Sequence, residues 1–373
     1  MRKLHGNMVG GVTLIVLALV LTLSGCAQVT AGALRAPVLA TPPSLTSSGA
    51  AVVNGRVLVT ADGGATWRDA TPSGIDASAS VAASFLTSAR GWVAASHSAS
   101  AITIYKTVDA GTTWTSVRLR VPVPQYSPAA IQFLDPWHGW LLVNTGQTMN
   151  AQDSALYGTS DGGATWRRLS TLSVAGTFHF SDPSIGWLVG SNVTAAPYQL
   201  YATHDGGHTW QQHVIADGII VQAGTSAVGL PVFTSARDGY LPIATNTTLD
   251  LLATHDGGAT WARAAHFTTP DQGNPTPMFT FHGVNGWLLD GAQLYGTHDT
   301  GRTWTPIRYS VSQPSLTLGA TGTLVLAGDT TGWAALRPFY TCQGAVCATS
   351  GVILQTTDGG QSWHVAWRQI TGA

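Results

Sequence analysis

Glutamate is absent from this chain of 373 residues, because all 18 of its acidic residues are aspartates. Lysine occurs only twice, and charged residues make up 9% of the chain, against about 25% in an average soluble protein. The lack of glutamate excludes every catalytic mechanism that needs one. The scarcity of lysine and the net charge of −1 exclude a polybasic surface for nucleic acid. They also argue against helical bundles, whose exposed faces normally consist of Glu and Lys.

The first 25 residues have the pattern of a signal peptide. Arg2 and Lys3 are followed by an apolar run over residues 9–23, which is shorter than the roughly 20 residues that span a bilayer as a helix. The run ends in Leu-Ser-Gly-Cys, which resembles the bacterial lipobox, and we predict lipid attachment at Cys26 on the extracytoplasmic face of the cell membrane. The alternative is an ordinary signal peptide with a chance cysteine. Residues 26–48, rich in Ala, Pro, Ser and Thr, are predicted to carry the lipid and form a flexible tether.

The two remaining cysteines lie close together in the sequence Cys-Gln-Gly-Ala-Val-Cys, as Cys342 and Cys347. Outside the cytoplasm this spacing favours a small disulfide loop. A metal site is a poor alternative, because two thiolates fall short of four ligands and the nearest downstream histidine is His364. We predict no metal and no cofactor.

A short motif of the form Thr-x-Asp-x-Gly-x-Thr/Ser-Trp occurs seven times, at intervals of 43 to 59 residues. The carboxylate can accept hydrogen bonds from turn amides, and the glycine suits a positive φ. The tryptophan then begins a return strand on which it buries a large apolar surface. Each copy is therefore predicted to be a tight β-hairpin. The Asp and Trp residues of the seven copies are Asp62 and Trp67, Asp109 and Trp114, Asp161 and Trp166, Asp205 and Trp210, Asp256 and Trp261, Asp299 and Trp304, and Asp358 and Trp363.

A second motif precedes the first in six of the seven units. It consists of an aromatic residue, a short turn and then Gly-Trp at the start of a strand, as in Phe85 to Trp92. Each unit then holds four short strands, and tandem units of this kind are propeller blades. The sequence predicts an all-β fold, a seven-bladed β-propeller of four-stranded antiparallel blades over residues 49–373. The first unit lacks the second motif, so its outermost or innermost strand comes from residues 36–53 or is missing.

The repeat resembles the Asp-box family, also known as BNR repeats. The paired Gly-Trp and Thr-x-Asp-Gly-Gly-x-Thr-Trp signature looks most like the photosystem II assembly and stability factor family. That resemblance covers residues from about 49 to 373. It implies a seven-bladed propeller and, for bacterial members, a lipoprotein that faces away from the cytoplasm.

Sialidases also contain Asp boxes, which makes glycan hydrolysis the enzymatic alternative. In that family a glutamate activates the tyrosine nucleophile, and this chain has none. Hydrolysis by two aspartates is still chemically available, but Asp135 and Asp182 lie in Phe-x-Asp turns that explain them structurally. Three boxes read Thr-His-Asp, at His204, His255 and His298. Equivalent positions on separate blades lie around a ring, so we interpret them as solvated turn histidines and not as one metal site.

Connection lengths indicate which face binds a ligand. The box hairpins and the turns between first and second strands are uniformly short, and both kinds emerge on one face of a propeller. Longer and more variable connections emerge on the opposite face, and variable loops on a rigid scaffold usually carry binding. The alternative is that their side chains only cover the blade ends. The candidate binding residues on this face are Tyr126, Tyr198, Arg337, Phe339 and Tyr340.

These features predict a non-enzymatic, lipid-anchored, extracytoplasmic propeller that serves as an assembly scaffold for another protein of the membrane or envelope. The alternative is a carbohydrate-binding or sialidase-like cell-surface protein, so a glycan ligand stays open. No nucleic-acid partner is predicted, and membrane attachment is expected through Cys26 only.

Overall fold

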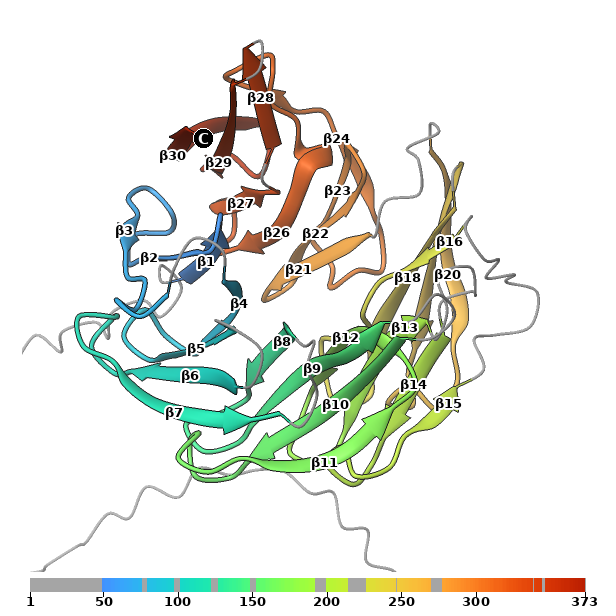
Figure 1. Ribbon diagram of the computed structural model, residues 1–373. Coiled ribbons are helices and arrows are strands. Elements are labelled where there is room, and N and C mark those ends of the chain that lie inside the picture. The colour runs from blue at the N-terminus through green and yellow to red at the C-terminus, as the bar shows by residue number, and fades with distance from the viewer. Residues whose placement is uncertain are drawn as a thin grey trace, which may run out of the picture. The chain divides into compact units, whose positions relative to one another are not determined.

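The computed structural model describes residues 49–75, 79–96, 101–121, 127–147, 152–191, 199–213, 226–245, 247–269, 277–337, 339–343 and 346–372. Within these ranges the side chains of residues 127, 129, 147, 152, 226, 339–343, 346–349, 371 and 372 are not described. The strands form seven small sheets that follow one another around a ring (Figure 1). This confirms the predicted seven-bladed β-propeller.

Four blades consist of four antiparallel strands that run in chain order from the propeller axis outward (Figure 1). Their strands are β4 (Ser80–Phe85), β5 (Gly91–Ser96), β6 (Ala101–Thr107) and β7 (Thr115–Arg120) in blade 2; β8 (Ser127–Phe133), β9 (Gly139–Gln147), β10 (Gln152–Thr159) and β11 (Arg167–Leu172) in blade 3; β12 (Ala175–Phe180), β13 (Gly186–Ser191), β14 (Gln199–Thr203) and β15 (Gln211–His213) in blade 4; and β21 (Met278–His282), β22 (Asn285–Asp290), β23 (Gln293–Thr297) and β24 (Thr305–Ile307) in blade 6.

The other three blades depart from this plan, and their strands are as follows. Blade 1 has β1 (Gly49–Val53), β2 (Arg56–Thr60) and β3 (Arg68–Asp69); blade 5 has β16 (Ser226–Val228), β17 (Val232–Phe233), β18 (Gly239–Thr245), β19 (Thr248–Thr254) and β20 (Ala262–Thr268); blade 7 has β25 (Ser310–Val311), β26 (Thr321–Leu326), β27 (Gly332–Leu336), β28 (Phe339–Gln343), β29 (Val346–Thr356) and β30 (Ser362–Gly372). The 3₁₀ helix η1 (Leu318–Ala320) precedes β26. Among the described residues, no helix has the length and apolar character needed to cross a membrane.

The register identifies which strand of blade 1 has no described counterpart. Gly49 pairs with Thr60, just as Gly91 at the start of β5 pairs with Thr107 in blade 2. The strand β1 therefore occupies the position of the second strand of a blade, and Ala50 is equivalent to Trp92 of blade 2. In the described chain, blade 1 therefore lacks a counterpart of the innermost strand.

Hydrogen bonds between turns place the two short-turn types on one face. Gly162 in the third Asp box donates its N–H to the carbonyl of Trp137 at 2.9 Å, in the turn between the first and second strands of the same blade. Gly206 donates in the same way to Ser184 at 2.9 Å, and blades 2, 5, 6 and 7 contain the equivalent bond. The predicted placement of these two turn types on a common face is therefore confirmed.

Aromatic side chains pack each blade against the next. Trp92 of blade 2 stacks on Phe133 of blade 3 with ring centroids 3.6 Å apart. Phe133 also covers Gly139, where an added Cβ would lie 2.6 Å from the ring, so the Gly-Trp glycine makes room for the aromatic residue. Where blade 1 has no such aromatic residue, Trp333 of blade 7 lies directly over Gly49, with its ring 3.2 Å from a Cβ built there.

Candidate functional site

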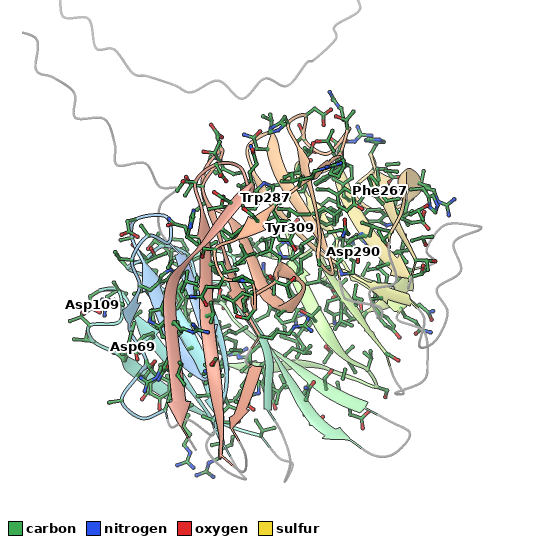
Figure 2. All side chains as sticks on the ribbon, turned by 90° about the horizontal axis from the view of Figure 1, so that it is seen from above. Asp69, Asp109, Phe267, Trp287, Asp290 and Tyr309 are labelled. Atoms are coloured by element: carbon green, nitrogen blue, oxygen red, sulfur yellow. The ribbon has the colours of Figure 1, made fainter. Side chains whose placement is uncertain are left out.

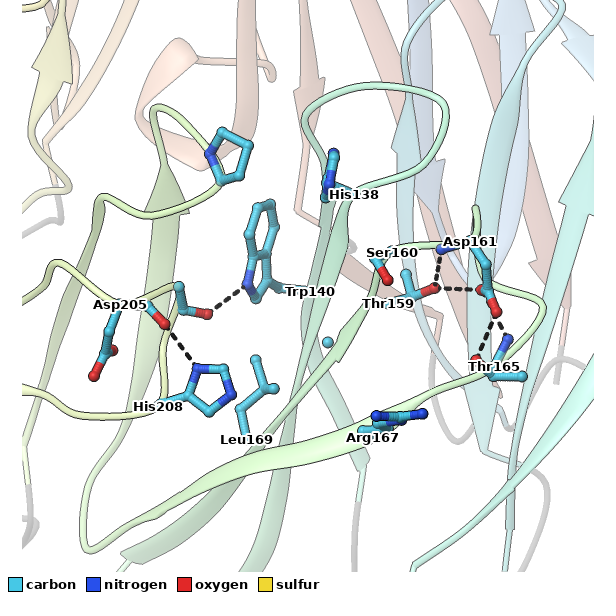
Figure 3. A pocket seen from close by; sticks show the side chains of 13 residues that line it. His138, Trp140, Thr159, Ser160, Asp161, Thr165, Arg167, Leu169, Asp205 and His208 are labelled. Carbon is cyan, nitrogen blue, oxygen red and sulfur yellow. Dashed lines mark hydrogen bonds between the residues drawn. The ribbon is translucent and has the colours of Figure 1, made fainter.

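Each Asp box is closed by the same set of hydrogen bonds, which Figure 3 shows for Asp161. Its Oδ1 accepts from the Thr159 hydroxyl at 2.8 Å and from the Thr165 amide at 2.9 Å, and its Oδ2 accepts from the Thr165 hydroxyl at 2.6 Å. The Gly163 amide donates to the Thr159 hydroxyl at 3.0 Å. The other six boxes repeat this arrangement with their own Thr or Ser residues.

These hydrogen bonds keep the box carboxylates ionised. The hydroxyl and amide of Thr113 hold the pKa of Asp109 at about 2, and Thr165 does the same for Asp161. A hydrogen bond to the charged form favours that form. A carboxylate with such a pKa holds no proton to donate at neutral pH, so these aspartates act as acceptors that close the turn.

Two of the three histidines next to the boxes, His255 and His298, have individual hydrogen-bond partners. His255 Nδ1 lies 2.8 Å from Asp238 Oδ1, and His298 Nδ1 lies 2.8 Å from Asn285 Oδ1. The side chain of His255 is 80% exposed. No three His, Cys, Asp or Glu residues in the described ranges come together in a group that could hold a metal ion.

Of the five candidate binding residues, the structure places only the side chain of Arg337. Tyr126 and Tyr198 lie outside the described residues, and so does the lipidation candidate Cys26. Phe339 and Tyr340 belong to β28 through their backbones, but their side chains are not described. The disulfide between Cys342 and Cys347 stays a prediction, and the backbone register pairs these two residues across the β28–β29 hairpin.

Arg337 lines a cavity of about 460 Å³ at the innermost strands of blades 4 to 7. Its guanidinium is the one charged group on walls that are mostly apolar. Burial lowers the pKa of His179, which also lines the cavity and is therefore neutral at pH 7. The other residues that line this cavity are Thr177, Leu230, Pro231, Val232, Pro277, Met278, Phe279, Gly322, Thr323 and Leu324.

A second cavity, of about 490 Å³, shares Thr323 with the first and lies beside β1. Its walls come from β1, from the inner strands β4, β8 and β26, and from Trp333. Sequence reasoning missed both cavities, because they form where inner strands of different blades meet. The sequence did predict an inner strand that ends at each aromatic residue. It did not show which of these strands would together line a cavity.

A third cavity, of about 420 Å³, lies on the Asp-box face between blades 3 and 4 (Figure 3). Trp140 forms part of its wall and donates its indole N–H to the Gly206 carbonyl at 3.0 Å. His208 places Nδ1 2.7 Å from the Asp205 carbonyl oxygen, which directs its Nε2 away from that bond. Arg167 adds an exposed guanidinium.

One carboxyl group stands apart from the box aspartates. Asp290 lies at the end of β22 (Figure 2). It is fully buried, and neither of its oxygens has a hydrogen-bond partner in the described part of the chain. Burial raises its pKa to about 6. Because it lines none of the three cavities, we assign it no part in binding.

Comparison with known proteins agrees with the geometry. The family model described as photosynthesis system II assembly factor YCF48 matches residues 47–175. The solved structure of YCF48 bound to D1 peptide is 19% identical, with a TM-score of 0.53, and the alignment covers 84% of this chain and 90% of that one. A search of curated proteins gives no match.

Two further structures are more distant. YCF48 from Cyanidioschyzon merolae is 16% identical over 85% of this chain and 91% of its own, with a TM-score of 0.47. A GH93 α-L-arabinofuranosidase of Fusarium graminearum is 12% identical over 71% and 90%, with a TM-score of 0.45. The chain is thus a seven-bladed β-propeller with seven Asp boxes, similar over residues 47–175 to the BNR-repeat family model. Within that class it resembles the photosystem II assembly factor YCF48.

Proposed function

We propose that this protein is a non-enzymatic binding scaffold for another protein of the membrane or envelope. The observation that carries the proposal is the apolar cavity at the inner strands with Arg337 on its wall. Such a site suits a polypeptide with apolar side chains and one acidic group, because a guanidinium binds carboxylates well. The similar structure of YCF48 bound to D1 peptide supports a polypeptide partner.

The proposal includes the location of the protein. A lipid on Cys26, followed by the tether of residues 26–48, holds the propeller at the extracytoplasmic face of the membrane. Labelling cells with an alkyne-bearing fatty acid tests this part. We expect label on the wild-type protein and none on Cys26→Ser, and labelling of both would contradict the anchor.

Crosslinking in membranes, with mass spectrometry of the captured proteins, tests the scaffold. We expect Arg337→Ala, and separately a double variant with Phe339→Ala and Tyr340→Ala, to lower capture of a defined membrane partner about tenfold, as for loss of an interface hot spot. Trp137→Ala is the matched control, because Trp137 is 59% exposed on the Asp-box face. Unchanged capture by the first two variants, with loss in the Trp137 variant, would place the binding site on the other face.

The glycan alternative has one observation in its favour, the cavity between blades 3 and 4. Arg167, His208 and Ser160 offer polar groups there, of the kind that hydrogen-bond to sugar hydroxyls and acidic sugars. A glycan array and fluorogenic sialosides test it on the intact protein. Binding that is lost in Arg167→Ala would favour a lectin, and turnover above background would refute the non-enzymatic scaffold.

A further inference from the structure

A glutamine on the innermost strand of blade 3 is bonded to the backbone of blade 4, where β8 and β12 lie near the propeller axis (Figure 1). Gln132 Oε1 accepts from the Phe180 amide at 2.7 Å, and Gln132 Nε2 donates to the Phe180 carbonyl at 2.9 Å. A backbone N–H can only donate and a carbonyl oxygen can only accept. These two bonds therefore fix which end of the Gln132 side-chain amide is the nitrogen.

The same amide nitrogen determines where the neutral His179 ring carries its proton. Gln132 Nε2 lies 3.3 Å from His179 Nδ1, and its second hydrogen is the one left for this contact. Because an amide nitrogen donates and does not accept, Nδ1 must be the acceptor. The proton of the neutral imidazole is therefore on Nε2. In the described chain, the His179 side chain has no other hydrogen-bond partner.

His179 thus offers a neutral N–H donor to the cavity that Arg337 also lines. Protonation of the ring would place a hydrogen on Nδ1, directly against the hydrogens of Gln132 Nε2. This opposition acts in the same direction as burial, which lowers the pKa of His179. Burial is the one cause of that lowering, so no charged group in the described chain adds to it. The ring is therefore a neutral donor at pH 7.

Arg337 carries the second donor of the cavity, and it lies nearer the face opposite the Asp boxes. Its Cγ is 3.2 Å from a Cβ built on Gly322, so the side chain begins by packing over that glycine. The blade 7 equivalent of His179 is Val325, which stands three residues after Gly322 on β26. The levels of Gly322 and His179 are therefore about 8–10 Å apart along the strands.

The remaining walls do not supply acceptors that match these two donors. Thr177 and Thr323 are the other polar side chains of the cavity, and none of the residues that line it carries a carboxylate. A ligand must bring its own acceptors, because a buried polar group is costly unless it is hydrogen-bonded. A carboxylate matches the guanidinium. An uncharged carbonyl oxygen matches the neutral N–H, since a second buried charge would have no counter-charge there.

We propose that this cavity takes a segment of the partner polypeptide with two acceptors at different depths. One is a carboxylate that binds Arg337, and the other is an uncharged amide carbonyl, deeper in the cavity, that accepts from the Nε2–H of His179. Gln132 is a positioning residue, because it keeps that proton on Nε2. The inference rests on the proposed scaffold function and names the chemistry of the segment that the scaffold selects.

Nuclear magnetic resonance of nitrogen-labelled histidine in the full chain, held in lipid nanodiscs, reads the tautomer directly. We expect His179 Nδ1 to resonate as an unprotonated acceptor and Nε2 as a protonated donor. The signals are identified by their loss in His179→Phe. Gln132→Met should release Nδ1, mix the two tautomers and raise the pH at which the ring becomes protonated. A proton on Nδ1 in the neutral wild-type ring would overturn the proposal.

A peptide probe tests the two acceptors on the same sample. The probe acetyl-Asp-Leu-Val-Leu-amide should shift the Nε2–H signal of His179 saturably. The probe acetyl-Asn-Leu-Val-Leu-amide lacks the carboxylate and should bind about tenfold more weakly. No shift with the first probe, or equal binding of the two, would overturn the proposal. Laurate has a carboxylate and no amide carbonyl, so binding of laurate as tight as that of the first probe would show a site for lipid chains instead.

Crosslinked capture of the membrane partner gives the functional readout. His179→Phe should lower capture about tenfold, because the acceptor of the partner loses its donor. His179→Gln should keep most of it, since its amide can donate. Gln132→Met should lower capture about threefold at pH 8 and recover as the pH falls, because a protonated ring carries N–H on both nitrogens. A purely structural role of Gln132 would give the same loss at every pH.

Ser84→Ala is the matched control for Gln132→Met. Ser84 Oγ accepts from the Phe133 amide at 2.9 Å, which is the same kind of bond between neighbouring blades, and it does not line this cavity. Ser84→Ala should therefore capture the partner as the wild type does at every pH. A pH-dependent loss in Ser84→Ala equal to that of Gln132→Met would contradict the role given to Gln132.

The outcomes separate this inference from the scaffold function. If Arg337→Ala and His179→Phe both lower capture, both proposals stand. If Arg337→Ala lowers it and neither His179→Phe nor Gln132→Met does, the inference falls and the scaffold stands. If the wild type captures no defined partner, the scaffold falls, and the tautomer of His179 is still read by resonance. Should His179→Phe fail to fold, Gln132→Met and the two peptides decide the question.

Discussion

At the scale of single residues, aspartate serves two opposite purposes in this protein. In the boxes, hydroxyl and amide donors surround the carboxylate and hold it charged. Asp290 has no such donors and is fully buried, so burial favours its neutral form. The same side chain is therefore ionised in one place and protonated well above its usual pKa in another.

Replacing Asp290 with asparagine should stabilise the protein at high pH. Its pKa of about 6 lies above the ordinary 3.8, so the folded state binds the proton more tightly than the unfolded state. Below pH 3.8 both states are protonated and there is no penalty, whereas above pH 6 the folded state must hold a buried charge at a cost of about 3 kcal/mol or less. Urea unfolding should show Asp290→Asn more stable than wild type at pH 8 and nearly equal at pH 3.5.

Asp250 provides the control for that experiment. It is also buried, at 7% exposure, but it lies 2.9 Å from Arg263 Nε and 2.8 Å from His266 Nδ1. Asp250→Asn should therefore lower stability at pH 8, because Arg263 loses the carboxylate with which it forms an ion pair. Equal effects of the two substitutions would mean that Asp290 has a partner after all.

At the scale of the element, the two glycine positions of an Asp box are under different structural constraints. Both have positive φ, but the first is replaced by Ala110 in one box and by Thr300 in another, at φ of 62° and 64°. The second is glycine in all seven copies. At Gly258 an added Cβ would lie 2.3 Å from Trp187, whereas at Gly359 nothing lies within 4 Å.

This difference predicts unequal effects of alanine at the two positions. Gly359→Ala carries only the left-handed backbone strain, about 1–2 kcal/mol. Gly258→Ala adds a clash with a buried ring, for a total of about 2–5 kcal/mol. Thermal unfolding of the two variants in parallel measures the gap, and equal melting temperatures would show that Trp187 can move aside.

Local sequence patterns predicted the blades, but they did not predict which strand of blade 1 has no counterpart in the described chain. The Thr-x-Asp hairpins form within eight residues, so their turn chemistry is readable from sequence. In blade 1, Ala50 replaces the tryptophan that marks the second strand elsewhere, and Gly49 alone did not reveal the motif. Only the pairing of Gly49 with Thr60 identifies the position of β1 in the blade.

At the scale of the whole molecule, the candidate binding site was predicted only in part, because its walls come from residues far apart in the sequence. Loop lengths singled out Arg337, which does line a cavity. The cavity beside β1 joins Ala50 to Val325, residues from opposite ends of the chain. A repeat pattern in the sequence does not indicate which inner strands face one another across the closed ring. The residues that line this cavity therefore could not be predicted from the sequence.

The aspartates together predict a stability maximum in mildly acidic solution. The pKa values of Asp109, Asp161, Asp299 and Asp358 are about 2, below the ordinary 3.8, so their contribution is complete above pH 4 and is lost as the pH falls towards 2. Asp290 acts in the opposite sense, because its destabilising effect grows as the pH rises from 3.8 to about 6 and is complete above that. Tryptophan fluorescence in urea, measured from pH 2.5 to 8, should place the highest unfolding midpoint between about pH 4 and 6. A midpoint that rises steadily up to pH 8 would contradict this balance.

The ring closes without a strand shared between its two ends in the described chain, and this has a mechanical consequence. At the seam, Gln355 Nε2 donates to the Gly63 carbonyl at 3.1 Å, and Trp67 meets Trp333 edge to face at 4.9 Å. At every other junction between neighbouring blades, the polypeptide chain itself connects the two blades in addition to such contacts. Under tension applied between Gly49 and Gly372, the load therefore falls on a few side-chain contacts at the seam. The propeller should open there first, while the six other junctions between blades stay intact.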